Sequence, residues 1–350
     1  MNLKNVLPNG HPGEIILFTY PESVFGRRMV RYLNLRRLPF SQIRVPPNMP
    51  RPILQQRLGI NYRRIPIMAI GRDIYIDTRL MLAKLETFFP ENRLGAEDGF
   101  GAGVEDLFEN FVIDGGPFWR TAGCIPPTAP LMENEVWTKD RFDGSGGGFT
   151  KQALLDNRSW SISQLRIYYG IVEKMLGDGR PWILGGDNPG LAEIHAGWVY
   201  DWGINMAQDM EDDSGGATAD MQRALSDVEF PKLYEWVKRF REVADKANKD
   251  HAEGGRLQEG ADAEYKVVDC ILAAGFTEQD PCFDETDVLG LQKGQPITIA
   301  PVDFGFTHKD EGNLIGLSRN EVVIEAQVPQ GMGSLRLHYP RINFKILSKS

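Results

Sequence analysis

The stretch from residue 13 to residue 95 constrains the fold most, because strand and helix signals follow one another there at short intervals. Residues 15–19 form an apolar run that is typical of a strand, and residues 20–22 have the composition of a turn. Ser23 then occupies an N-cap position ahead of apolar residues at helical spacing. Residues 40–45 indicate a second strand, and strand, helix and strand in this order predict a parallel pair.

The second half of this stretch predicts a hairpin followed by a helix. Ile65 and Pro66 precede an apolar run that ends at residue 70, and a second short run covers residues 74–76 after a Gly-Arg-Asp turn. Asp77 and Thr78 then stand at the start of another amphipathic helix.

The combined order of these elements resembles the thioredoxin-like domain of glutathione transferases, in particular fungal glutathione-transferase-like proteins with an additional C-terminal domain. The resemblance covers about residues 13–250. It implies a thioredoxin-like, glutathione-binding α/β domain over residues 1–95 and an all-helical domain over residues 104–252. Residues 256–350 add a helix and a small antiparallel β domain, so the expected fold class is α/β plus all-α plus a small β domain.

Composition supports a multidomain globular protein and argues against several partners. The 350 residues suggest two or three domains, and the net charge of −9 argues against nucleic acid or an anionic membrane. We see neither a signal peptide nor an apolar run of about 18 residues, so we expect a cytoplasmic location. The three cysteines and five histidines lack metal-ligand spacing, so no metal is expected.

The C-terminal segment, residues 256–350, combines one helix with four or five short runs rich in Val, Ile and Phe. These runs predict a small antiparallel barrel or meander. A unit of this size is marginally stable alone, so we expect it to dock on the helical domain or across a dimer partner. It has no recognisable nucleophile–base pair, which suggests packing or substrate gating.

Two hydroxyls are candidates for stabilising a glutathione thiolate. A free thiol with a pKa of about 8.5 is only about 3% ionised at pH 7, and lowering this pKa by about two units requires roughly 2.7 kcal/mol. One hydrogen bond to the thiolate supplies roughly 1.5–3 kcal/mol. Ser23 fits the serine-type motif of the family, although Val24 replaces its proline, and Tyr20 is the rival donor. A third alternative is that neither hydroxyl is catalytic.

The resemblance also assigns the remaining glutathione contacts. Pro66 is expected to be cis, so that the backbone of Ile65 meets the cysteinyl part of glutathione. Asp77 and Thr78 replace the usual Glu-Ser pair and are expected to bind the ammonium and carboxylate of the γ-glutamyl part. Arg64, with the neighbouring Arg63, could meet the glycyl carboxylate.

The helical domain is expected to form the wall for an apolar substrate. His195 is expected to be a packed core residue. The aromatic candidates for the substrate wall, each with ordinary core packing as the alternative, are Trp119, Tyr169, Trp198 and Trp202.

Three functions remain open from the sequence. The first is a homodimeric, glutathione-dependent enzyme of specialised metabolism, which conjugates glutathione to a small hydrophobic, enone-like molecule or uses it to isomerise that molecule. The second is a non-catalytic binding or scaffold protein, because fold alone does not establish function. The third is a glutathione-independent cyclase or isomerase that uses the same cleft.

Overall fold

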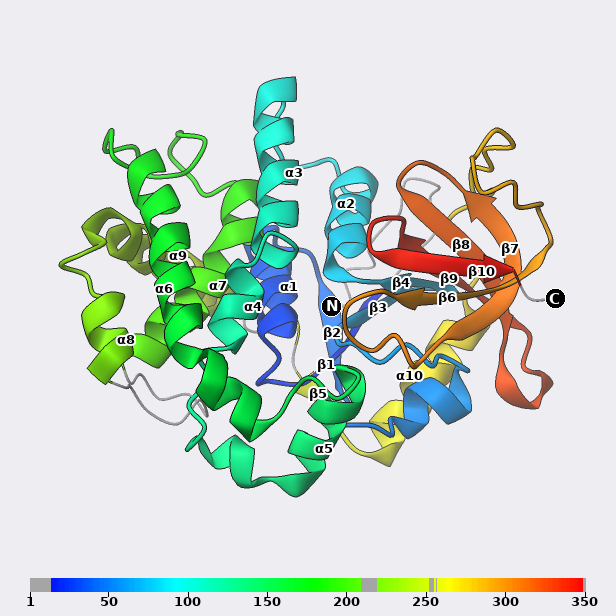
Figure 1. Cartoon of the computed structure of the whole chain (residues 1–350). Helices are drawn as coiled ribbons and strands as arrows, with labels where there is room; N and C mark the ends of the chain where they lie inside the picture. The colour runs from blue at the N-terminus through cyan, green and yellow to red at the C-terminus, as the bar shows by residue number, and fades with distance from the viewer. Residues whose placement is uncertain (1–13, 209–218, 252–254, 256, 349–350) are drawn as a thin grey trace.

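The computed structural model describes residues 14–208, 219–251, 255 and 257–348. In Figure 1 the helices of residues 99–250 lie on one side, the strands of the C-terminal segment lie on the other, and the first strands and helices lie between them. The first elements are β1 (Ile15–Thr19), α1 (Val24–Leu35), β2 (Phe40–Arg44), the π-helix η1 (Ile53–Arg57), β3 (Ile67–Ile70), β4 (Asp73–Ile76) and α2 (Thr78–Phe88).

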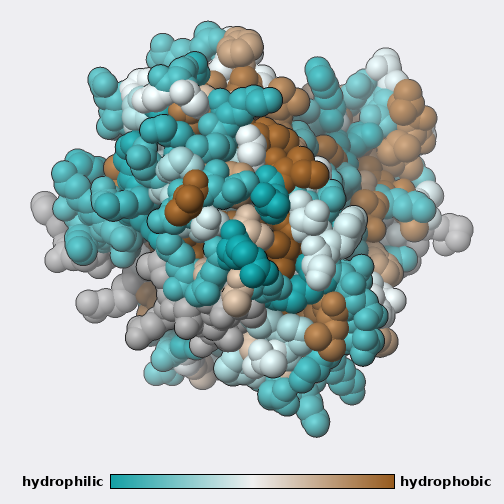
Figure 2. Space-filling model, turned by 60° about the vertical axis from the view of Figure 1, so that its left-hand side comes forward, coloured by the Kyte–Doolittle hydropathy of each residue, from teal (hydrophilic) through white to brown (hydrophobic). Residues whose placement is uncertain are grey.

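The middle of the chain is helical. Its elements are α3 (Gly99–Ile113), α4 (Pro117–Ala122), the 3-10 helix η2 (Pro130–Glu133), α5 (Glu135–Gly144), α6 (Lys151–Met175), α7 (Leu191–Gln208), α8 (Ala219–Ala224) and α9 (Pro231–Asp250). None of the helices in the described part of the chain is both long and apolar enough to cross a membrane. Figure 2 shows the helical side with separate apolar patches between hydrophilic side chains.

The C-terminal segment, called the extension from here on, consists of the residues from 257 to 348. Its elements are β5 (Leu257–Gln258), α10 (Ala261–Ala273), β6 (Pro296–Pro301), β7 (Asp310–Leu317), β8 (Glu321–Gln327), the 3-10 turn η3 (Pro329–Gly331), β9 (Ser334–Pro340) and β10 (Phe344–Ser348). Strands β6 to β10 pair antiparallel with one another, so the expected antiparallel β-rich extension is confirmed.

All described strands belong to one sheet, in the order β10-β6-β7-β8-β9-β4-β3-β1-β2-β5. Within the thioredoxin-like part, β1 pairs parallel with β2 and antiparallel with β3. The extension adds β9 parallel to β4 at one edge and β5 parallel to β2 at the other. The extension is docked, as expected, but the expected surface is corrected. Its main attachment is to both edges of the thioredoxin-like sheet, and its contact with the helical domain is the smaller one, through Gly144 of α5 and Asp114.

The alternation of side chains along the first strand separates two hydrophobic cores. Ile15 and Leu17 face a core that contains α1, α2 and the middle helices. Ile16 and Phe18 face the opposite core, which contains η1, α10 and the strands of the extension. The sheet is therefore covered on both faces, which explains why β1, β3 and β4 are buried at every position.

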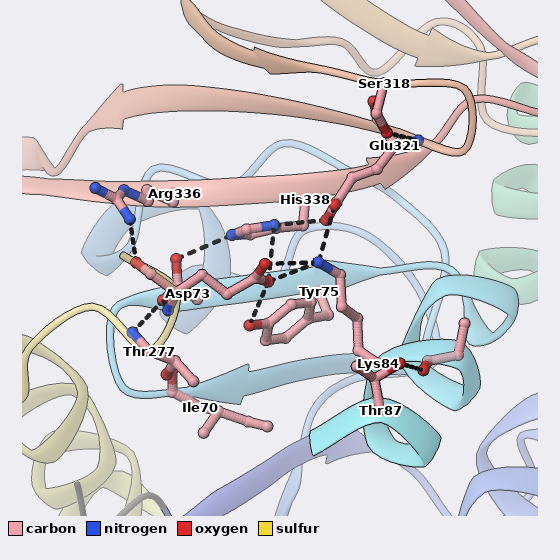
Figure 3. A network of polar contacts seen from close by, with 12 residues as sticks. Ile70, Asp73, Tyr75, Lys84, Thr87, Thr277, Ser318, Glu321, Arg336 and His338 are labelled. Atoms are coloured by element: carbon pink, nitrogen blue, oxygen red, sulfur yellow. Dashed lines mark hydrogen bonds and ion pairs between the residues drawn. The ribbon is translucent and has the colours of Figure 1, made fainter. Parts of the chain in front are cut away.

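A network of charged side chains joins the extension to the thioredoxin-like sheet (Figure 3). The ring of His338 on β9 lies 2.9 Å from a carboxylate oxygen of Asp73 on β4 and 2.8 Å from one of Glu321 on β8. Lys84 of α2 donates to Glu321 at 2.8 Å and to Glu278 at 2.7 Å. Burial alone would lower the pKa of His338, but Asp73 and Glu321 raise it above its ordinary value. The network thus favours a protonated His338 at the junction of β4 with the extension.

Candidate functional site

A cavity of about 860 Å³ lies between the thioredoxin-like part, the middle helices and the extension. This volume falls within the usual range for small-molecule sites, about 300–1,000 Å³. Its polar side is lined by residues that include Tyr20, Ser23, Arg64, Asp77 and Thr78. Its apolar side is lined by Phe25, Ile113, Phe118, Trp119, Ala122, Ile125, Leu131, Trp137, Phe149 and Trp202. The cavity therefore offers both polar anchoring groups and an apolar wall.

Ser23 is the N-cap of α1, and its hydroxyl oxygen accepts from the amide of Gly26 at 3.0 Å. A Cβ at residue 26 would lie 2.1 Å from the hydroxyl of Thr19, so only glycine lets the first turn approach β1 this closely. Because a serine hydroxyl has one hydrogen and two lone pairs, Ser23 can still donate into the cavity. Tyr20 lines the same end of the cavity, so the geometry leaves both proposed thiol donors in place.

Asp77 and Thr78 begin α2 beside the cavity. Asp77 has a positive φ of 72° and caps the helix by accepting from the amide of Arg79 at 3.1 Å. Non-glycine residues rarely adopt this conformation, and such strain gathers at functional sites. The buried hydroxyl of Thr78 accepts from Nη1 of Arg28 at 3.0 Å, which leaves its own hydrogen for a ligand.

Arg28 belongs to a buried cluster behind the cavity. Its guanidinium pairs with Glu109 of α3, and His195 of α7 contacts the same carboxylate. Burial would raise the pKa of Glu109, but Arg28 and His195 hold it well below its usual range. His195 is buried and does not line the cavity, in agreement with the expected core position.

The peptide bond between Ile65 and Pro66 is cis, as the sequence predicts, and both residues line the cavity. Arg64 precedes them and lies between two carboxylates. Its Nη1 is 3.7 Å from Asp77, and its Nη2 pairs with Asp303 of the extension. Arg64 is therefore held at the polar end of the cavity by acidic residues from two distant parts of the chain.

The four aromatic candidates divide into two pairs. Trp119 and Trp202 line the cavity. Tyr169 is buried between Tyr200 and Phe230, and it does not line the cavity. Trp198 is also absent from the lining. Its ring packs against Phe25 and Phe118, which do line the cavity, with ring centroids 4.6 Å and 5.7 Å away. Tyr169 and Trp198 are core residues in this structure.

Two basic cavity residues, Arg51 and Arg141, were not identified from the sequence, whereas Arg63 was. Arg51 and Arg141 line the cavity together with Arg63, which pairs with Asp140 at 2.7 Å. Burial and the two neighbouring guanidinium groups lower the pKa of Arg51 to about 10. Nε and Nη1 of Arg63 are buried and have no hydrogen-bond partner among the described residues. The end of the cavity lined by Arg51, Arg63 and Arg141, called the basic end from here on, carries an excess of positive charge, which suits an anionic group.

A possible cation site elsewhere is occupied by a side chain. Three possible ligand atoms lie close together where β4 meets the extension, one each from Glu278, Glu321 and His338. However, the ammonium group of Lys84 lies 2.7 Å from Glu278 and 2.8 Å from Glu321. Lys84 thus supplies the cation that these carboxylates require.

Residues 17–93 match the family model described as Glutathione S-transferase, N-terminal domain. These residues form a glutathione S-transferase N-terminal domain. Residues 120–249 match a domain of unknown function (DUF7962). No curated protein matches the sequence.

One solved structure confirms a glutathione S-transferase-like fold. A GST-like protein from Pseudomonas syringae superposes with a TM-score of 0.66 and 20% identity, over 96% of this chain and 99% of that one. The extension therefore has a structural counterpart in that protein, while the expected fungal type stays a prediction. A tau-class glutathione S-transferase from mango, Mangifera indica, gives a TM-score of 0.47, 13% identity and coverages of 69% and 96%. The Bombyx mori glutathione transferase gives a TM-score of 0.45 and 16% identity, over 68% of this chain and 92% of that one.

Proposed function

We propose that this protein is a glutathione-dependent enzyme that acts on a hydrophobic, electrophilic small molecule in specialised metabolism. One observation carries the proposal. A single cavity has the polar residues of a glutathione S-transferase N-terminal domain on one side and the aromatic wall of the middle helices on the other. Such a cavity can hold glutathione next to an apolar partner.

The residues of the polar side fit glutathione in one orientation. Thr78 and the amide groups at the start of α2 suit the γ-glutamyl carboxylate, because helix N-termini favour anions. Asp77 suits the neighbouring ammonium group, and the backbone of Ile65 suits the cysteinyl part. The basic end that Arg51, Arg63 and Arg141 form suits the glycyl carboxylate.

The proposed chemistry requires the chain to stabilise a thiolate and to hold an electrophile near it. Glutathione supplies the nucleophilic sulfur, which either stays bonded to an enone-like substrate or leaves again after isomerisation. Ser23 donates its hydroxyl hydrogen to the sulfur, and the dipole at the N-terminus of α1 stabilises the thiolate by a further amount of about 0.3–1 kcal/mol. Trp119 and Trp202 exclude water from the apolar partner, which strengthens these interactions.

We also propose that the protein forms a homodimer. Apolar side chains of α3 and α6 are exposed, among them Leu107 at 68%, Ile167 at 56% and Ile171 at 40%. Covering such side chains would be favourable. Analytical ultracentrifugation of the full chain tests this assembly directly, and a single monomeric species at micromolar concentration would contradict it.

The function is tested in two steps. Calorimetry first measures glutathione binding to the full-length protein. The protein is then incubated with glutathione and a panel of apolar enones, and free thiol and products are followed by mass spectrometry. Conjugation consumes glutathione, whereas isomerisation returns it.

The outcomes separate the three functions left open by the sequence. Binding with turnover of an enone supports the proposal. Binding without turnover of any panel member favours a non-catalytic binding protein. Absence of glutathione binding contradicts the proposal and leaves a glutathione-independent enzyme.

A further inference from the structure

The loop between β6 and β7, residues 302–309, brings the extension into the cavity. Asp303 and Phe304 of this loop are part of the cavity lining. Nε of Arg64 donates to the carbonyl oxygen of Phe304 at 2.9 Å, and the amide of Gly305 donates to Gly144 at 2.7 Å. The loop is thus fastened both to the segment before the cis proline and to the end of α5.

The ring of Phe304 holds the loop against the basic end of the cavity. The guanidinium carbon of Arg63 lies 5.0 Å from the ring centroid, and that of Arg141 lies 5.8 Å away. Both distances are within the range of cation–π contacts. Phe304 therefore packs on cations, and Asp303 beside it is directed to a different neighbour.

Asp303 forms an acidic pair with Asp77 around one cation. Arg64 pairs with both carboxylates, whose side chains are 25% and 13% exposed. Burial would lower the pKa of Arg64, but nearby Tyr62, Asp303 and Asp77 raise it, so the guanidinium stays charged. Arg79 is a second guanidinium near Asp77, but it pairs with Glu109 and Asp114. Asp77 and Asp303 therefore share the guanidinium of Arg64, and a cationic group of a ligand would meet two carboxylates at this end of the cavity.

We propose that Asp303 is a ligand-binding residue by which the extension, together with Asp77, receives the ammonium group of a γ-glutamyl ligand. This inference rests on the proposed function, because it assigns one part of glutathione to one residue of the extension. The ammonium group is the only cationic group of glutathione at neutral pH, and its carboxylate neighbour is directed to Thr78. The extension therefore completes the glutathione site as well as the sheet.

The test uses two ligands that differ only at the proposed contact. Calorimetry measures the binding of glutathione and of glutaryl-cysteinyl-glycine, in which hydrogen replaces the α-ammonium group, to the full-length protein. In Asp303→Asn the affinity for glutathione should fall about tenfold, as for one lost charge-assisted hydrogen bond, and the affinity for the analogue should stay unchanged. Asp303→Glu keeps the charge and should retain most of the glutathione affinity.

A matched control and the remaining outcomes make the test decisive. Glu285→Gln removes an exposed carboxylate of the same extension and should change neither affinity. Unchanged glutathione binding by Asp303→Asn would overturn the role of Asp303 while the proposed function stands. Equal losses for both ligands would also overturn it, because Asp303 would then only hold the loop. Failure of the unaltered protein to bind either ligand would overturn the proposed function, and this inference with it.

Discussion

Nη1 of Arg28 donates to the hydroxyl of Thr78 at 3.0 Å, and this bond connects the cavity to a buried ion pair with Glu109. Arg28 lies on α1, Thr78 begins α2 and Glu109 lies on α3, so one guanidinium fixes three helices relative to one another. The orientation of the proposed carboxylate-binding hydroxyl therefore depends on charges that never touch the ligand.

Replacing Arg28 with methionine should destabilise the protein by about 3–5 kcal/mol, because Glu109 would keep a buried charge without its main partner. Urea unfolding followed by circular dichroism measures this change. The exposed pair of Arg166 and Glu229 provides the control, and Arg166→Met should cost only about 0–1 kcal/mol. Similar costs for the two variants would contradict the structural role of the buried cluster.

Ser23→Ala should lower turnover of the proposed reaction by about 10²-fold, which is the loss expected for one donor that stabilises developing negative charge. It should also lower the free energy of unfolding by about 1 kcal/mol, because Ser23 caps α1. Steady-state kinetics at saturating glutathione measures the first effect, with Ser163→Ala on the exposed side of α6 as the control. Full activity in Ser23→Ala together with a loss in Tyr20→Phe would give the role to Tyr20.

The parts of the site that could be predicted from the sequence are those encoded within a few neighbouring residues. Ser23 stands between a strand and a helix, and the pair Asp77-Thr78 stands between a hairpin and a helix. Local capping chemistry and the order of elements suffice to locate such positions. The cis bond before Pro66 has a different basis, because an Ile-Pro pair alone does not distinguish cis from trans and the expectation came from the resemblance to glutathione transferases.

The rest depends on contacts between distant segments. Asp303 reaches Arg64 across 239 positions of the chain, and no local pattern marks a loop carboxylate as a cavity residue. The prediction that Trp198 lines the substrate site was wrong for a related reason. Helical spacing places it on a face of α7, but only the packing of Phe25 and Phe118 decides that it is covered.

Gly144→Ala should destabilise the protein by about 1–3 kcal/mol through overpacking. The added Cβ would lie 1.6 Å from Nη1 of Arg63 and 2.4 Å from the ring of Phe304. Arg63 cannot move away freely because it is buried and paired with Asp140. Thermal unfolding measures the effect, and Gly148→Ala is the control because its Cβ would meet only an ordinary contact at 3.5 Å. Equal stability of the two variants would show that Arg63 and the loop of residues 302–309 can shift to accept the added methyl group at little energetic cost.

The stability of the protein should fall as the pH rises above about 6.5, in part because of His338. The pKa of His338 is raised in the folded protein, so its stabilising contribution is complete below its unfolded pKa and is lost as the pH rises through its folded pKa. Urea unfolding between pH 5.5 and 9 measures this decline. His338→Gln should flatten the decline, whereas His308→Gln, at a histidine whose pKa is lowered by burial, should not. A slope unchanged in His338→Gln would exclude His338 as its source.

Removing the extension after residue 250 should yield an aggregated or unfolded protein. β4 would lose its parallel partner β9 at one edge of the sheet, and β2 would lose β5 at the other. The face that carries Ile16, Phe18 and Ile74 would also lose α10 and the strands that now cover it. Unpaired strand edges beside an exposed apolar face promote association of chains. Size-exclusion chromatography and urea unfolding of the truncated chain, beside the full-length protein, measure the outcome. A truncated chain that stays monodisperse and binds glutathione with full affinity would show that the thioredoxin-like sheet does not need the extension for its stability and that Asp303 does not contribute to glutathione binding.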